Sequence, residues 1–271
     1  MSTATAFTQH EVAIIYLARM VEEDKSYWTP GGGRPGFALS LAQKLHAPNV
    51  MRMTEEGCIS AQPYFPIEPF MYMGGARSNY RGVLWTSMNQ ICYYNTLGLV
   101  DYAILMVLEV DPYGNFNSSM IGGDYYHPQR RFGGAGGANE MASLAWRTLL
   151  VTDQDRRKFV KKCNFITSPG YLDGSPNARE RAGMPAGTGP YRVVNSEAIF
   201  GYDEKTHYMK LLAISSWTTV AEVLSKMDFE PLIAEKVETL KPPTEEELTI
   251  LRTEMDPEGR VVGAGEWILL E

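Results

Sequence analysis

Apolar residues recur along the first part of the chain at helical and then at strand-like spacing. Thr8, followed three positions later by Glu11, forms a capping box, and the spacing after it predicts a helix over roughly 8–24. A loop rich in glycine and proline separates this helix from a second one predicted over 37–46. The segment NVMRMT, residues 49–54, reads as a short strand. The chain therefore starts as helix, helix and strand.

Strands dominate the middle of the chain. The stretch VDYAILMVLEVD, residues 100–111, is a nearly continuous apolar run, typical of a parallel strand covered on both faces. RTLLVTD, residues 147–153, has the same character, whereas residues 191–215 alternate as antiparallel strands do. Two more capping boxes are expected to begin the last two helices: Thr219 to Glu222 and Thr244 to Glu247. This order of elements predicts an α/β fold with an antiparallel hairpin region near 191–215.

Composition limits the possible classes of protein. The chain has 271 residues, a net charge of -7, and no repeat or linker, so we expect one domain over 1–271. A basic stripe for nucleic acid is missing from the sequence. It also lacks the pattern of a signal peptide and any apolar run of membrane-spanning length, which predicts a cytoplasmic protein. Its three cysteines and four histidines are scattered, so neither a disulfide framework nor a metal site is expected.

Two glycine-rich loops lead into predicted helices and are candidate ligand sites. In RRFGGAGGAN, residues 130–139, a backbone without Cβ atoms can approach a ligand closely, and its amides suit an anion or an oxyanion. The candidate residues there are Gly136, Gly137, Ala138 and Asn139. A flexible surface turn is the alternative for this loop.

The other loop, TPGGGRPGFAL, spans residues 29–39. Arg34 within it can pair with a carboxylate or phosphate, and Gly32 and Gly33 precede it as candidate substrate contacts. An ordinary surface charge is the alternative for Arg34.

Two adjacent carboxylates, Glu55 and Glu56, follow the short strand at 49–54. Solvated turn residues are the usual interpretation of such a pair, because glutamate is rarely buried without a partner. Cys58 lies just beyond them, but no histidine neighbours it in the sequence to activate a thiol nucleophile.

Several segments together resemble one family. APNVMRMTEEG, DPYGNFNSSMIGGDYYHPQRRFGGAGGAN, RERAGMPAGTGPYRVV and GYDEKTHYM are similar to the β subunits of glutaconate CoA-transferase and its relatives, the class I CoA-transferases. The resemblance runs from about residue 8 to about residue 257. It implies an open, mainly parallel sheet flanked by helices. It also implies a catalytic glutamate in an E-S-G or E-N-G pattern, which falls on Glu55, with Gly57 in place and Glu56 standing where the family has Ser or Asn. Glu56 is a further candidate for contact with the substrate.

The resemblance further implies an activity. Coenzyme A would be a substrate and not a permanently bound cofactor, moving from an acyl-CoA to a short or dicarboxylic acid through acyl-glutamyl anhydride and glutamyl-CoA thioester intermediates. The partner would be a separate α subunit, in a heterodimer that assembles to a heterotetramer or larger. Other family members hydrolyse, ring-open or decarboxylate CoA thioesters, so these activities are the alternatives. A regulatory protein that retains the fold is a further one.

Overall fold

The structure is a computed structural model that describes residues 3–30, 33–66, 75–263 and 265–270. The chain divides into two compact units. Unit 1 comprises Met1–Ile104, Val194–Ser196 and Lys241–Glu271, and unit 2 comprises Leu105–Val193 and Glu197–Leu240. The expectation of a single domain over 1–271 stays a prediction.

Unit 1 is built on short strands in the order β6-β2-β3-β4-β5. The pairs β6–β2 and β2–β3 are parallel, whereas β3–β4 and β4–β5 are antiparallel. The bounds are β2 Ser26–Thr29, β3 Met51–Thr54, β4 Cys58–Ile59, β5 Leu84–Trp85 and β6 Tyr102–Met106, whose last two residues belong to unit 2. A separate pair joins β1 Ala6–Thr8 to β16 Trp267–Leu269.

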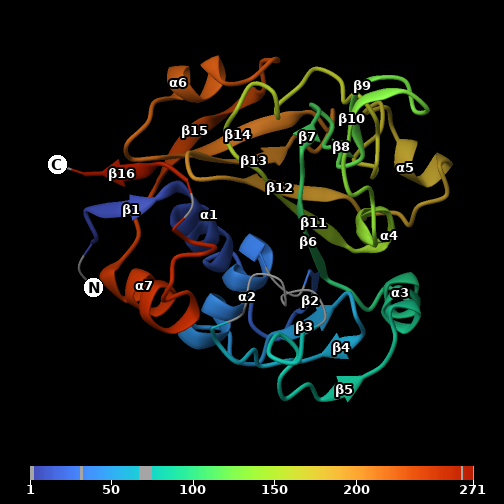
Figure 1. The fold of residues 1–271 in the computed structure, drawn as a ribbon. Coiled ribbons are helices and arrows are strands. Elements are labelled where there is room, and N and C mark those ends of the chain that lie inside the picture. Colours follow the sequence, from blue (N-terminus) through green and yellow to red (C-terminus); the bar gives the residue numbers. More distant parts are fainter. Residues whose placement is uncertain (1–2, 31–32, 67–74, 264, 271) are drawn as a thin grey trace. The chain divides into compact units, whose positions relative to one another are not determined.

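Helices cover the strands of unit 1. They are α1 Gln9–Ala18, α2 Gly33–Leu45, α3 Met88–Thr96, α7 Glu245–Thr249 and the π-helical turn η1 Ile250–Met255. Helices α1 and α2 pack against each other, and α2 lies beside β2 and β3 (Figure 1). Every residue of α1 from Glu11 to Ala18 is buried, so this helix lies in the core of the unit.

Unit 2 contains the strands β11-β12-β13-β14-β15, in that order. They are β11 Arg147–Val151, β12 Pro190–Val194 (whose Val194 belongs to unit 1), β13 Ala198–Tyr202, β14 Met209–Ser215 and β15 Leu232–Leu240. Two hairpins, β7 Glu109–Val110 with β8 Phe116–Asn117 and β9 Met120–Gly123 with β10 Pro128–Arg131, belong to the same unit. Its helices are α4 Ala138–Leu144, α5 Ala178–Arg181 and α6 Val220–Ser225. The antiparallel pair β13–β14 confirms the hairpin predicted near 191–215.

All three predicted capping boxes are present, at the starts of α1, α6 and α7. Helix α1 nevertheless ends at Ala18 and not near residue 24. The amide of Val21 turns back to the Ala18 carbonyl, and the amide of Glu22 donates to the hydroxyl of Tyr27 at 2.9 Å. Asp24 then takes φ 59°, which is incompatible with a continuing helix. Tertiary contact with β2 therefore ends the helix early.

The apolar run at 100–111 is also interrupted. It forms β6 and then β7, because the amide of Val107 still pairs with Val151 while that of Leu108 turns to Asn117. The run ends at Asp111, which is 7% exposed, and its carboxylate accepts hydrogen bonds from the backbone amides of Tyr113 and Asn115. Burial raises the pKa of Asp111 to about 6, although these hydrogen bonds oppose the rise.

Asp111 should make the stability of the protein fall between about pH 4 and pH 7. A pKa raised in the folded state means that the folded chain binds the proton more tightly, so this contribution is present at low pH and is lost as pH rises through about 6. The rise from 3.8 to about 6 corresponds to about 3 kcal/mol. Urea unfolding across this range should show that Asp111→Asn lacks this loss. The assignment to Asp111 would be contradicted if the stability of Asp111→Asn depended on pH as that of the wild type does. It would also be contradicted if the exposed control Glu204→Gln removed the pH dependence.

Candidate active site

A tight turn joins β3 to β4 and carries the two glutamates. The amide of Gly57 donates to the carbonyl of Thr54 at 3.1 Å, and the amide of Cys58 donates to the Thr54 hydroxyl at 3.2 Å. Glu55 and Glu56 occupy the two positions between Thr54 and Gly57. The turn is therefore closed by backbone and by one hydroxyl, and its two central side chains take no part in closing it.

Gly57 is required by the space around it. Its φ is +106°, and a Cβ there would lie 2.5 Å from the carbonyl oxygen of Thr86. The amide of Thr86 returns a hydrogen bond of 2.9 Å to the carbonyl of Gly57, and Cys58 pairs with Trp85 of β5. The segment around β5 therefore lies directly against the turn and holds it in place.

The two glutamates have different surroundings. Both are half-buried, but only Glu56 has its two carboxylate oxygens covered by protein, and these accept no hydrogen bond from any described residue. Glu55 makes no hydrogen bond or ion pair with the residues that the structure describes, and its oxygens are not among those covered. Glu55 is thus the carboxylate that a reactant can reach within this chain, and Glu56 is not.

An arginine lies beneath this turn. Arg52, in β3, is fully buried, and its Nη1 donates to the Ser40 hydroxyl of α2 at 2.8 Å. Burial lowers the pKa of Arg52 to about 10, and the negative charge of Glu56 opposes that fall. Burial also raises the pKa of the Cys58 thiol, which argues against a thiolate nucleophile there. The pattern of NVMRMT gave no reason to single out Arg52, apart from its being the one charge in an otherwise mainly apolar strand.

The glycine-rich loop at 29–39 is only partly described. Gly32 lies outside the described residues, while Gly33, with φ 61°, begins α2 in the same unit as the glutamates. Arg34 follows it and is only 7% exposed. The interpretation of Arg34 as an ordinary surface charge was therefore wrong, because the residue is almost fully buried.

The glycine-rich loop at 130–139 belongs to unit 2 and leads into α4. The backbone amide of Ala138 donates to the carbonyl of Ala135 at 2.8 Å, and the side-chain amide of Asn139 donates to the Thr167 carbonyl at 2.9 Å. The backbone amides of Gly136 and Gly137 donate to no described residue. These two amides are therefore available as donors, as are those of Gly133 and Ala135, whereas the backbone of Ala138 and the side chain of Asn139 help to hold the shape of the loop.

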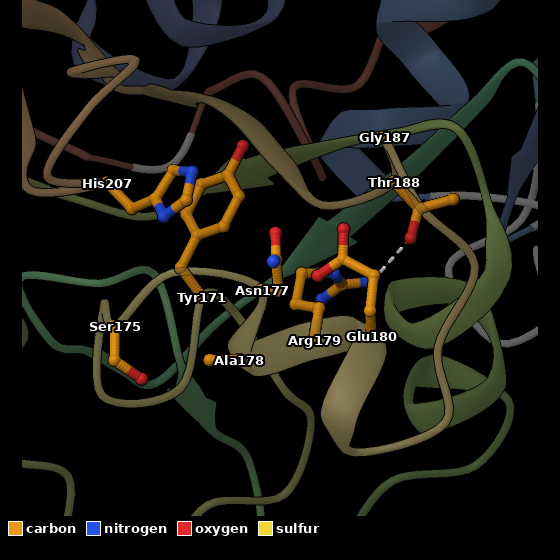
Figure 2. A pocket seen from close by; sticks show the side chains of 9 residues that line it. All are labelled: Tyr171, Ser175, Asn177, Ala178, Arg179, Glu180, Gly187, Thr188 and His207. Carbon is orange, nitrogen blue, oxygen red and sulfur yellow. Dashed lines mark hydrogen bonds between the residues drawn. The ribbon is translucent and has the colours of Figure 1, made fainter.

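Sequence reasoning did not single out a separate cavity in unit 2. It has a volume of about 210 Å³ and is lined partly by Arg179, which is 3% exposed (Figure 2). The guanidinium of Arg179 donates to the carbonyl of Gly170 at 2.7 Å and to the Thr188 hydroxyl at 3.0 Å. Across the cavity, the rings of Tyr171 and His207 are stacked, with their centroids 4.3 Å apart. Through these hydrogen bonds Arg179 connects the segment around Gly170 with the segment around Thr188.

Comparison with known proteins places this arrangement in a family. The profile of the family described as coenzyme A transferase matches residues 23–226, about three quarters of the chain. The chain belongs to the coenzyme A transferase family. It is 32% identical over 262 residues to the B subunit of glutaconate CoA-transferase of Acidaminococcus fermentans, covering 95% of this chain and 96% of that protein.

Other members support the same family. The B subunit of 3-oxoadipate CoA-transferase of Pseudomonas knackmussii is 29% identical, covering 92% of this chain and 93% of that one. The crystal structure of the Acidaminococcus fermentans glutaconate CoA-transferase matches with a TM-score of 0.87 at 29% identity, over 94% of this chain and 97% of that chain. The decarboxylase AibA/AibB, at 20% identity and a TM-score of 0.74, over 95% of this chain and 100% of that chain, shares the fold. The α/β fold class predicted from the sequence is thereby confirmed.

The described residues contain no cluster of histidine, cysteine or carboxylate side chains suited to hold a metal ion. Among the helices that the structure describes, none is both long and apolar enough to cross a membrane.

Gly57→Ala should destabilise the protein by at least about 2 kcal/mol, because the new Cβ meets the Thr86 carbonyl and the backbone keeps a positive φ. Gly183→Ala is a matched control, since Gly183 has φ +87° but nothing within 4 Å of the added Cβ. The loss of stability of each variant, measured by thermal or urea unfolding, separates the steric overlap with Thr86 from the strain of a positive φ. Equal losses in the two variants would show that the close approach at Thr86 has no role.

Proposed function

We propose that this chain is the β subunit of a heteromeric CoA-transferase, which moves CoA between an acyl-CoA and a carboxylic acid. The observation that carries the proposal is the turn at Thr54–Gly57, which leaves the Glu55 carboxylate unengaged while Glu56 is covered. The similarity to the B subunits of two named CoA-transferases supports it. Both of those names specify a dicarboxylate, so we propose dicarboxylic or short acyl groups as substrates.

The reaction follows from a nucleophilic carboxylate. An oxygen of Glu55 attacks the thioester carbonyl carbon, the C–S bond breaks, and an acyl-glutamyl anhydride forms with release of CoA thiolate. The thiolate then attacks the Glu55 carbonyl of the anhydride, which releases the donor acid as a carboxylate and leaves a glutamyl-CoA thioester. The acceptor carboxylate repeats both steps in reverse and regenerates Glu55. Each step exchanges one anion for another, so no net proton transfer is needed.

Each attack passes through a tetrahedral oxyanion, which needs hydrogen-bond donors. We propose the backbone amides of Gly136 and Gly137 for this role, because they have no acceptor among the described residues. One such donor typically contributes about 3 kcal/mol to the transition state. Gly32, Gly33 and Arg34 are proposed as contacts to the substrate; an enclosed guanidinium is well suited to a carboxylate.

A second subunit is required by the proposal. The two relatives are named as the B subunits of their enzymes, and the chain spans nearly their full length, so it corresponds to one subunit of each pair. We propose that a separate α subunit completes the site, in a heterodimer that assembles further. An enclosed site would keep water from the anhydride, which otherwise hydrolyses, and would desolvate Glu55 for attack.

Glu55→Gln should lower CoA transfer by more than about a thousandfold, the order of loss seen when a covalent nucleophile is removed. The assay uses the chain copurified with its α subunit, an acyl-CoA and an acceptor acid. In a second assay, wild-type enzyme is incubated with acyl-CoA alone and reduced with borohydride. We expect peptide mass spectrometry to find a primary alcohol at residue 55 and unmodified Glu56.

Glu55→Gln provides the control for the trapping assay, because it should give no reduced residue. Transfer at the wild-type rate by Glu55→Gln would overturn the assignment of the nucleophile. Thioester hydrolysis or decarboxylation by the wild-type enzyme, without a trapped residue, would instead favour one of the other activities found on this fold.

A further inference from the structure

A stretch of unit 1 carries no charged residue. Residues 82–100 contain no Asp, Glu, Lys, Arg or His, although charged residues make up 21% of the whole chain. A segment of this composition normally lies in the core of a protein. Here only Ile91, Asn95 and Val100 are buried, and the other residues are half-buried or exposed. The segment therefore presents an uncharged, mainly apolar surface.

This surface is formed by β5 and α3. Both residues of β5 are exposed, and α3 buries Ile91 and Asn95 alone, so the opposite face of the helix is open. Strand β5 is the end strand of its sheet, and the chain runs from it into α3 along the same side of unit 1 (Figure 1). We call this the β5–α3 surface; its exposed apolar residues are Val83, Leu84, Trp85, Met88, Tyr93, Leu97 and Leu99.

The size of the β5–α3 surface matches one side of a protein interface. Val83 and Trp85 are more than half exposed, and the apolar residues of the surface together expose on the order of 700 Å². A soluble monomer rarely leaves that much apolar surface open, and each partner contributes about 800 Å² to a standard interface. Trp, Tyr and Met are also enriched in interfaces, where charged residues are depleted. The composition and the exposed area both indicate a docking surface.

The β5–α3 surface borders the turn that carries Glu55. The amide of Thr86 donates to the carbonyl of Gly57 at 2.9 Å, and Trp85 pairs with Cys58. A protein seated on this surface would therefore lie next to Glu55, whose carboxylate no described residue of this chain engages. The proposed reaction needs an enclosed carboxylate, because water would hydrolyse the anhydride. The expected occupant is thus the subunit that completes the site.

We propose that the α subunit docks on the β5–α3 surface through an apolar, uncharged patch of its own and thereby encloses Glu55. This inference rests on the proposed function and names the surface of this chain that the second subunit uses. The apolar side chains supply the area that is buried, and their contact with the Glu55 turn couples docking to the formation of the site.

The first test places a charge on the surface. Tyr93 lies in α3 and is 55% exposed, so Tyr93→Glu is compatible with the folded chain. We expect its affinity for the α subunit, measured by sedimentation, to fall by at least about a hundredfold, because docking would bury an unpaired charge. The matched control is Tyr126→Glu, at a residue of unit 2 that is 84% exposed. Its affinity should stay within about threefold of the wild-type value.

The second test uses a probe that the chain already contains. Cys92 lies in α3 and is partly exposed, while Cys58 and Cys163 are buried. Iodoacetamide should label Cys92 in the full chain alone, and formation of the complex should slow this labelling by at least about tenfold, since alkylation requires access to the thiolate. Because this test uses the wild-type sequence, it decides the proposal even if a variant fails to fold.

A third measurement separates docking from catalysis. Tyr93 has no part in the proposed chemistry, so a saturating concentration of the α subunit should return CoA transfer by Tyr93→Glu to within about threefold of wild type. A saturated but inactive complex would place Tyr93 in the substrate site and overturn its role in docking.

The other outcomes are equally decisive. Unchanged affinity of Tyr93→Glu, an equal loss of affinity in Tyr126→Glu, or undiminished labelling of Cys92 in the complex overturns the docking surface. Protection of Cys92 by acyl-CoA alone, or by self-association of this chain, overturns it as well, since another occupant would then cover the surface. A wild-type complex that protects Cys92 but gives neither transfer nor a trapped Glu55 would overturn the proposed function and leave the interface standing.

Discussion

The close approach of two backbone segments at Gly57 determines the geometry of the candidate active site. The carbonyl of Thr86 occupies the space that a side chain at position 57 would need. Since no side chain is there, the segment around β5 lies against the turn and pairs with Gly57 and Cys58. The direction in which the chain leaves β3 follows from this contact, and so do the surroundings of both glutamates.

The two carboxylates of this turn differ because protein covers one and not the other. Neither glutamate makes a hydrogen bond or ion pair with the described residues, but both oxygens of Glu56 are covered and those of Glu55 are not. A carboxylate that is already strongly hydrogen-bonded is a poorer nucleophile, because those bonds must weaken as its charge moves to the new bond. An unengaged Glu55 avoids that cost, and this favours it as the reacting group of a thioester exchange.

The sequence predicted the starts of helices well, because these depend on residues that are near one another along the chain. The capping boxes at Thr8, Thr219 and Thr244 begin helices as expected, because a cap involves only residues three apart. The end of α1 depended instead on Tyr27 of β2, and the division of the apolar run at 100–111 depended on its partners in other strands. Such long-range contacts leave no local pattern.

The candidate site shows the same limit. Resemblance to the family pointed to Glu55 and Gly57, but the burial of Arg34 and Arg52 is known only from the structure. An arginine in a short strand or loop is usually exposed, whereas Arg52 is buried and donates a hydrogen bond to Ser40 of α2.

Position 56 has a freedom that its neighbours lack. The proposed chemistry constrains residue 55, and space constrains residue 57 to glycine. The residue between them closes no hydrogen bond of the turn, so a substitution there changes the electrostatic surroundings of Glu55 while the backbone of the turn keeps the bonds that close it.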